Sequence, residues 1–334
     1  MNLKGGIAMS FKNITKVLTA TAGAAASLTA GASYMLFRQV IGRNAKLYPA
    51  VASAVVKQQN KNKPAAPAPA TPDERNVWFN NQSFEEYSMV NDRGQSLRAY
   101  LLPADAPSDI YVFGSHGYRN HGRGEFNYMA KFYHDMGCNV FLVDHQSAGL
   151  SDGKYIGFGY YESADCLKWL DFMLKSFGAD IQIILHGVSM GSATVMLMCG
   201  SAALPDNVKF AVADCGYTSA WNQFEYILNK AKVPVFPLLS GANAFSRIIA
   251  GYDFKDADAL ASVKRAKLPM LFIHGSTDDF VPTYMGKELF EACASPEKEL
   301  LIVDGAMHAQ SYRKDSTAYE NAVRGFMQRY IKQA

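Results

Sequence analysis

The fold is decided by residues 181–191, which read IQIILHGVSMG. The first five residues are mostly apolar and have the length of a buried strand. The turn that follows places Ser189 between Gly187 and Gly191, and a helical pattern begins directly afterwards. Such a strand-to-helix turn strains the serine backbone and exposes its hydroxyl, while the glycines leave room for the turn. We interpret Ser189 as a candidate nucleophile, and an ordinary helix cap is the competing interpretation.

Strand-like and helix-like patterns alternate on both sides of this turn. Short apolar runs between longer helical patterns predict a mostly parallel sheet flanked by helices. The expected strands cover residues 83–90, 96–102, 110–113, 139–143, 181–185, 210–213, 269–273 and 299–303. The expected helices cover residues 125–136, 160–176, 191–202, 283–294 and 316–331. The sequence therefore predicts one α/β domain over residues 77–334.

The segment at residues 217–267 breaks this alternation, because roughly 50 mostly apolar and aromatic residues separate two expected strands. A connection of that length usually has a function. We expect a small helical cap over the carboxyl ends of the strands, where ligands bind in open α/β sheets. Extra core helices without substrate contact are the alternative.

A serine hydroxyl needs a histidine to take its proton and a carboxylate to hold that histidine. Both follow Ser189 in the chain order that such a sheet requires. His308 comes directly after the last expected strand, and Asp278 ends the preceding one. The adjacent Asp279 points in a different direction from the same turn, so only one of these two carboxylates can reach His308.

The oxyanion formed during acyl transfer needs two backbone N–H donors. We expect one from Met190, which follows the nucleophile, and the other from Tyr118, in the loop after the strand at residues 110–113. His116 is expected to organise this loop rather than to take part in chemistry. Arg119 is expected in a solvated part of the loop, with binding of a substrate carboxylate as the alternative.

These residues resemble the α/β-hydrolase superfamily, particularly its serine-aminopeptidase-like branch of membrane-tethered bacterial hydrolases. The resemblance covers residues 80–330 and includes the turn at Ser189, the loop at His116, and residues 144–151, 263–275 and 304–309. It implies that Asp278, at the fifth position of an HGxxDxxVP pattern, is the catalytic carboxylate and that His308 is the catalytic histidine. Gln146 and Ser147 stand where the family usually has Arg and then Gly, which affects substrate fit more than chemistry.

The amino-terminal arm is basic, since residues 1–63 contain nine of the 33 Lys and Arg residues and none of the 30 Asp and Glu residues. Residues 17–37 are uncharged and long enough for one membrane span. A membrane anchor, a signal peptide cleaved near Ala32 and a surface helix without a membrane role remain alternatives. Pro and Ala residues then predict an extended linker.

The expected organisation is an arm over residues 1–57, a linker over 58–76 and the hydrolase domain over 77–334. The resemblance implies a single-pass anchor with the catalytic domain outside the cytoplasm. We expect the arm to contribute no catalytic residue.

Several partners are not expected. After residue 63, acidic residues outnumber basic ones by 30 to 24, so the domain would repel a phosphate backbone and nucleic acid is an unfavourable partner. Five scattered cysteines lack metal-ligand spacing and predict buried free thiols. Neither a metal nor an organic cofactor is expected, and the oligomeric state stays open.

Together these observations predict a serine hydrolase that cleaves carboxylic esters of small molecules through an acyl-enzyme. An aminopeptidase or amidase, an acyltransferase with the same triad, and a non-catalytic surface-interaction protein on the same fold are the alternatives. An aminopeptidase would need an acid to meet the substrate ammonium group, and Glu225 of the expected cap is the candidate.

Overall fold

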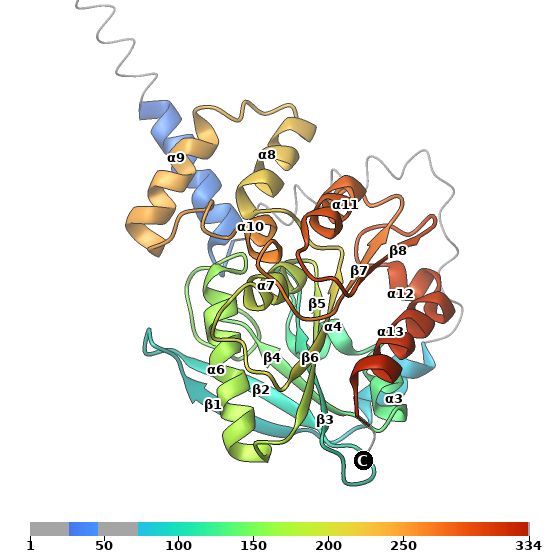
Figure 1. Ribbon diagram of the computed structural model, residues 1–334. Helices are drawn as coiled ribbons and strands as arrows, with labels where there is room; N and C mark the ends of the chain where they lie inside the picture. The colour runs from blue at the N-terminus through green and yellow to red at the C-terminus, as the bar shows by residue number, and fades with distance from the viewer. Residues whose placement is uncertain (1–26, 46–72, 333–334) are drawn as a thin grey trace, which may run out of the picture.

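A single eight-stranded sheet forms the centre of the protein (Figure 1). The structure is a computed structural model, and it describes residues 27–45 and 73–332. The strand order is β1-β2-β4-β3-β5-β6-β7-β8, in which β1–β2 and β2–β4 are antiparallel and the other pairs are parallel. The strands are β1 Glu85–Val90, β2 Ser96–Leu102, β3 Ile110–Ser115, β4 Asn139–Asp144, β5 Gln182–Val188, β6 Val208–Asp214, β7 Met270–Gly275 and β8 Lys298–Val303. The predicted mostly parallel α/β sheet is therefore confirmed.

Helices cover both faces of this sheet (Figure 1). One face carries α6 Tyr160–Phe177, α7 Met190–Cys199, α10 Ala259–Val263 and α11 Thr283–Ala292. The other face carries α3 Glu74–Asn80, α4 Gly122–Phe126, α5 Ala130–Asp135, α12 Ser311–Lys314 and α13 Ser316–Tyr330.

Each face of the sheet has its own hydrophobic core. In β3, Phe113 packs into the core that contains Trp169 of α6. The preceding residue, Val112, packs into the opposite core with Phe126 and Tyr133. Successive strand residues point to opposite faces, so a strand buried on both sides must be apolar at consecutive positions. This requirement explains why the short apolar runs of the sequence predicted the strands.

The predicted cap segment divides into two parts. Helices α8 (Ala220–Lys230) and α9 (Leu238–Phe245) and the π-helical turn η1 (Ser246–Ala250) form the cap. The side chain of Gln223 in α8 donates a 2.7 Å hydrogen bond to the carbonyl of Phe280, in the loop after β7. Helix α10 instead packs against α7 and α11. The carboxyl-terminal part of residues 217–267 therefore belongs to the helical layer, as the alternative of extra core helices predicted.

The described part of the amino-terminal arm is docked on the cap. Residues 27–41 are helical, and Ser33, Phe37, Val40 and Ile41 on one face of this helix are buried. Figure 1 shows the helix, in blue, beside α9. The ring of Phe37 lies 6.3 Å from that of Phe245 at the end of α9. One face of the second part of the predicted membrane span thus packs on protein, while residues 17–26 of that span and residues 58–72 of the predicted linker lie outside the described residues. The predicted end of the linker was wrong, because α3 already begins at Glu74.

This docking sets a condition on the predicted span. Among the helices of residues 27–45 and 73–332, none combines the length and apolar content that crossing a membrane requires. If the chain is docked from Ser33 onward, residues 17–32 would extend only about 24 Å as a helix, whereas the hydrocarbon core measures about 30 Å. The helix therefore cannot be docked on the cap while residues 17–37 span a membrane.

Phe37→Ala should lower the free energy of unfolding by about 3 to 5 kcal/mol, because it leaves a cavity where a fully buried ring packs. Met35→Ala is the matched control on the same helix, since Met35 is 52% exposed, and it should change stability by less than about 0.5 kcal/mol. Urea denaturation of the full chain measures both variants. Equal, small effects would mean that the helix is not docked and would favour the span over residues 17–37.

Candidate active site

The turn at Ser189 is held by close backbone packing. Ser189 has φ 56° and ψ −114°, and its side chain makes no capping bond to α7. A side chain at Gly187 would place its Cβ 2.2 Å from the carbonyl oxygen of Gly191. A side chain at Gly191 would place its Cβ 1.9 Å from the carbonyl oxygen of Ser115. Both glycines are therefore required by the packing, and the ordinary helix-cap interpretation of Ser189 is wrong.

The structure brings the three predicted triad residues together. Nε2 of His308 lies 2.9 Å from Oγ of Ser189, and Nδ1 lies 2.8 Å from Oδ2 of Asp278. The three residues come from the loops after β5, β7 and β8, whose carboxyl ends share one edge of the sheet. Ser189 is only 7% exposed, so the expected exposed hydroxyl is instead enclosed. The ring of Phe280 lies 4.9 Å from that of His308.

Asp278 is held in its ionised form. Its Oδ1 accepts hydrogen bonds from the backbone N–H groups of Phe280 and Val281, both at 3.0 Å. Burial acts to raise the pKa of the carboxyl, but the imidazoles of His308 and His274 outweigh burial and hold that pKa well below its usual range. An ionised carboxylate can fix one tautomer of His308 and stabilise the imidazolium that forms when it takes a proton.

Two residues next to Asp278, His274 and Asp279, make different contacts. Nε2 of His274 lies 3.3 Å from Oδ2 of Asp278 and 2.9 Å from the carbonyl oxygen of Val281. No role was predicted for His274, although it is the first residue of the HGxxDxxVP pattern. Asp279 points away and pairs with Lys230 of α8 at 3.2 Å. Of the two adjacent carboxylates, the one that reaches the histidine is the one expected.

The backbone of the predicted oxyanion loop runs beside the nucleophile. A side chain at Gly117 would place its Cβ 3.4 Å from Cβ of Ser189, so the residue before Tyr118 is in contact distance. Met190 begins the ten-residue helix α7, whose amino-terminal end carries a partial positive charge that favours an anion. Both expected donors, Tyr118 and Met190, thus belong to backbone segments that adjoin Ser189, since Tyr118 follows Gly117 and Met190 follows the serine itself.

Two buried side chains organise this loop. Glu125, which the sequence did not single out because it belongs to no motif, accepts hydrogen bonds from the N–H of Gly117 at 2.9 Å and the amide of Asn120 at 3.0 Å. His116 contacts the carbonyl of Gly117 at 2.7 Å and accepts from the N–H of His145 at 3.0 Å. Burial lowers the pKa of His116 to about 4, so it is neutral and organises the loop, as expected.

Arg119 has neither of its expected roles. Its guanidinium donates hydrogen bonds to the backbone carbonyls of Gln39, Gly42 and Arg43, at 3.0, 2.9 and 3.1 Å. It is therefore engaged with the amino-terminal arm and is neither in a solvated loop nor poised for a substrate carboxylate. The arm therefore contacts the oxyanion loop directly, a contact that the sequence did not predict.

A series of aromatic side chains extends from the oxyanion loop. The ring of Tyr118 lies 5.0 Å from Phe158, which lies 4.7 Å from Phe224 of α8. Phe224 in turn lies 4.8 Å from Phe254. These rings connect the oxyanion loop to the cap through apolar contacts.

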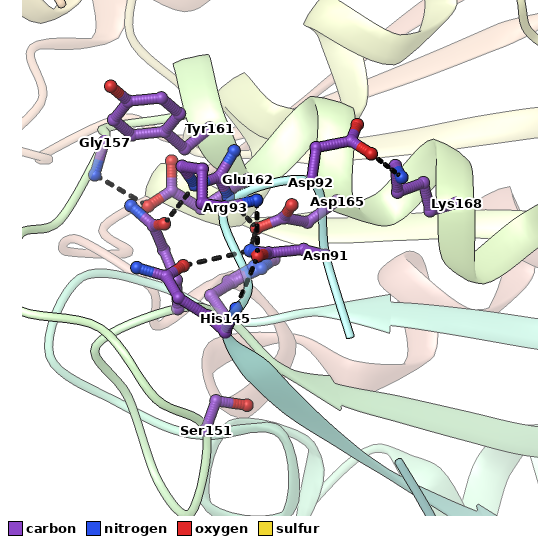
Figure 2. A network of polar contacts seen from close by, with 12 residues as sticks. Asn91, Asp92, Arg93, His145, Ser151, Gly157, Tyr161, Glu162, Asp165 and Lys168 are labelled. Carbon is purple, nitrogen blue, oxygen red and sulfur yellow. Dashed lines mark hydrogen bonds and ion pairs between the residues drawn. The ribbon is translucent and has the colours of Figure 1, made fainter. Parts of the chain in front are cut away.

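A buried polar network fixes the loop that carries Phe158 (Figure 2). The carboxylate of Glu162 accepts from the N–H groups of Gly157 at 2.7 Å and Gly159 at 2.8 Å. In the same network, Arg93 donates to Asp165 at 2.5 Å. Burial raises the pKa of Glu162 to about 7. The network therefore holds Phe158, whose φ of 51° is unfavourable for a non-glycine residue.

The two positions that depart from the family pattern also shape a loop. The amide of Gln146 donates to the carbonyl of Tyr155 at 2.8 Å, and the hydroxyl of Ser147 donates to the same carbonyl at 2.9 Å. Arg93 donates to the side chain of Gln146 at 3.2 Å. These contacts agree with an effect of Gln146 and Ser147 on the shape of the loop.

Ligand-type atoms of Cys215, Asp278 and His308 lie within 4.8 Å of one another. Asp278 and His308 are already hydrogen-bonded to each other. Burial, followed by the charges of Asp214 and Asp278, raises the pKa of the Cys215 thiol well above its usual range, which disfavours the thiolate that metal binding needs. The residues therefore fit a triad better than a metal site. All five cysteines are buried free thiols, as predicted.

Comparison with known proteins identifies relatives. Residues 237–312 match the hydrolase family described as serine aminopeptidase, S33. The uncharacterized protein YqkD of Bacillus subtilis is 32% identical over 253 residues, which cover 74% of this chain and 81% of that protein. An uncharacterized membrane protein of Saccharomyces cerevisiae is 24% identical over 196 residues, or 59% of this chain and 63% of that protein.

Solved structures show the same fold. An esterase of Pyrococcus furiosus superposes with a TM-score of 0.62 at 21% identity, over 81% of this chain and 98% of the esterase. The acylaminoacyl peptidase of Pyrococcus horikoshii superposes with a TM-score of 0.55 at 16% identity, over 78% of this chain and 44% of the peptidase. With the sheet order, the turn at Ser189 and the similarity to YqkD, these findings show that the chain belongs to the α/β-hydrolase superfamily, in its S33-like branch.

Proposed function

We propose that this chain is a serine hydrolase that cleaves carboxylic esters through an acyl-enzyme intermediate. The observation that carries the proposal is the hydrogen-bonded series from Ser189 through His308 to Asp278, with contacts of 2.9 and 2.8 Å. A histidine in contact with both a serine hydroxyl and a buried carboxylate is the arrangement that activates a serine nucleophile. The proposed reaction needs neither a metal nor an organic cofactor.

In the proposed reaction, Oγ of Ser189 attacks the ester carbonyl carbon while its proton passes to Nε2 of His308. Asp278 accepts the Nδ1–H hydrogen bond and stabilises the imidazolium. The N–H groups of Tyr118 and Met190 stabilise the oxyanion. The intermediate collapses, the C–O bond to the alcohol breaks, and the alcohol takes the proton from His308. Water then attacks the acyl-enzyme by the same route and releases the acid and the free enzyme.

Apolar surroundings favour an ester with an apolar acyl or alcohol group. Phe158, Phe224 and Phe280 lie close to the oxyanion loop and to His308. An ester releases an alcohol and needs no recognition of an amine. An aminopeptidase or amidase acting through the same residues is the second candidate, which the match to the serine aminopeptidase family favours. Glu225, partly buried on α8, is the acid that such an activity would use for the substrate ammonium group.

We also propose that the arm associates the domain with a membrane, with the catalytic domain outside the cytoplasm. The uncharged residues 17–37 between basic flanks support this proposal, and one relative is named as a membrane protein. The docked helix requires that the segment inserted into lipid ends before Ser33 whenever the helix is docked. The stability comparison of Phe37→Ala and Met35→Ala distinguishes the docked arrangement from a span that includes Phe37.

Ser189→Ala should abolish both labelling by a fluorophosphonate and turnover of esters, lowering kcat by several powers of ten, since only residual oxyanion stabilisation remains. Ser176→Ala, at an exposed serine of α6, is the matched control and should keep both activities. Circular dichroism checks that each variant is folded. Full labelling of Ser189→Ala would place the nucleophile elsewhere.

Asp278→Asn should slow acylation by about 10⁴-fold, because the amide favours the wrong tautomer of His308. Asp279→Asn should have little effect, since its carboxylate pairs with Lys230 and not with His308, and its side chain is 46% exposed, where ion pairs contribute little. Single-turnover kinetics with one activated ester compares the two variants. Equal and small effects would show that another group orients His308.

An ester series from acetate to octanoate tests the specificity. Each added methylene that is buried should contribute up to about 0.8 kcal/mol, or a factor of about 4 in kcat/KM, until the pocket is full. Aminoacyl amides should be poorer substrates, and Glu225→Gln should act like Glu291→Gln, an exposed control on α11. Amide hydrolysis that exceeds ester hydrolysis and is lost only in Glu225→Gln would replace the esterase proposal with the peptidase.

A further inference from the structure

The end of the docked arm helix and the oxyanion loop are joined by several hydrogen bonds. We call residues 33–43 of the arm the strap. The strap carbonyls of Gln39, Gly42 and Arg43 surround the guanidinium of Arg119. The adjacent residue, Tyr118, donates its hydroxyl proton to the carbonyl of Val40 at 2.5 Å. The residue expected to donate to the oxyanion therefore lies in a loop that is fastened to the strap by two consecutive side chains.

The carbonyl groups at the end of the strap helix and the guanidinium of Arg119 are chemically complementary. The last carbonyls of a helix have no partner inside the helix, and the carboxyl-terminal end carries a partial negative charge that attracts cations. Arg119 provides several N–H donors in a fixed planar arrangement. Its backbone has φ 58°, a region that costs energy for a residue other than glycine and persists only where surrounding contacts enforce it. The strap contacts provide such enforcement.

A second set of contacts fixes the strap from its other side. The guanidinium of Arg43 donates to the carbonyls of Ser151 at 2.6 Å and Gly149 at 2.9 Å. The N–H of Ile156 donates to the carbonyl of Ile41 at 2.8 Å. The loop that is held in this way also carries Phe158, against which the ring of Tyr118 packs. The strap thus holds both the oxyanion loop, which carries Tyr118, and the loop whose Phe158 packs against the Tyr118 ring.

We propose that the strap positions the oxyanion loop through Arg119 and Tyr118, so that full catalytic rate requires the arm to be docked. This inference rests on the proposed serine hydrolase. Arg119 is a positioning residue: it touches the strap, and the strap fixes the backbone from which the N–H of Tyr118 points to the developing oxyanion. Binding of the substrate in its ground state depends less on this N–H, so the strap acts on kcat more than on KM.

Arg119→Ala in the full chain tests the inference. We expect kcat for an oxygen ester to fall by about 10- to 100-fold with little change in KM, because an imperfectly placed oxyanion donor costs transition-state stabilisation. Tyr118→Phe keeps the ring and the backbone N–H and should cause a smaller fall in the same direction. Arg123→Ala is the matched control: Arg123 lies four residues along, over the rings of Phe84 and Tyr100, and its variant should keep kcat.

A thionoester, in which sulfur replaces the carbonyl oxygen, distinguishes an effect on the position of the oxyanion donors from an effect on folding. Sulfur accepts hydrogen bonds weakly, so a thionoester already lacks most of the benefit of the oxyanion donors. If the strap acts through those donors, Arg119→Ala should lower turnover of the oxygen ester much more than that of the matching thionoester. Active-site titration with a fluorophosphonate gives the fraction of folded enzyme, and kcat is expressed per labelled site. Phe37→Ala, which weakens docking from the arm side, should lower the ratio of oxygen-ester turnover to thionoester turnover, as Arg119→Ala does. Met35→Ala should leave this ratio unchanged.

Three results would overturn the inference. If Arg119→Ala has the same kcat per labelled site as Arg123→Ala, the strap does not position the loop. If turnover per labelled site falls equally for the oxygen ester and the thionoester, the contact does not act through the oxyanion donors. If the unaltered chain neither labels nor hydrolyses any ester, the proposed function fails, and this inference fails with it.

Discussion

The close approach of the Ser189 turn to the end of β3 is the constraint on which the rest of the site depends. β3 and β5 are parallel neighbours, and only a glycine at position 191 lets the turn pass the carbonyl of Ser115. This packing holds Ser189 in a backbone conformation that places its hydroxyl against His308 instead of at the start of α7. The same contact sets the oxyanion loop beside the nucleophile, since that loop begins where β3 ends.

The charge on Asp278 and the contacts of the arm hold the other parts of the site. A single buried carboxylate, Asp278, lies between two imidazoles and stays ionised because their effect outweighs its burial. On the opposite side of Ser189, the oxyanion loop is held by Glu125 from within the domain and by strap carbonyls from the arm. Residues 33–43 of the arm therefore pack as part of the folded domain, and their docking and the geometry of the loop are physically connected.

The sequence predicted features whose signals are local. Consecutive apolar residues predicted strands buried on both faces, and the glycine spacing around Ser189 predicted the strand-to-helix turn. The contacts of Arg119 could not be predicted, because its partners are backbone carbonyls about 80 positions earlier, and carbonyls carry no sequence signal. Glu125 belongs to no motif. The uncharged residues 17–37 predicted a membrane span, whereas within residues 27–37 only Ser33 and Phe37 are buried, on the face that packs on the cap, and most of the others are exposed. Hydrophobicity reports that a surface tends to leave water, and it does not tell lipid from α9 as the surface that covers it.

The central claim is that Ser189 is the nucleophile of an acyl-transfer site. Peptide mapping by mass spectrometry, after the full folded chain reacts with a fluorophosphonate, tests this claim most directly. We predict one adduct per chain, carried by Ser189 and absent after the chain is unfolded before labelling. An adduct on another residue, or no adduct on the folded chain, would contradict the account.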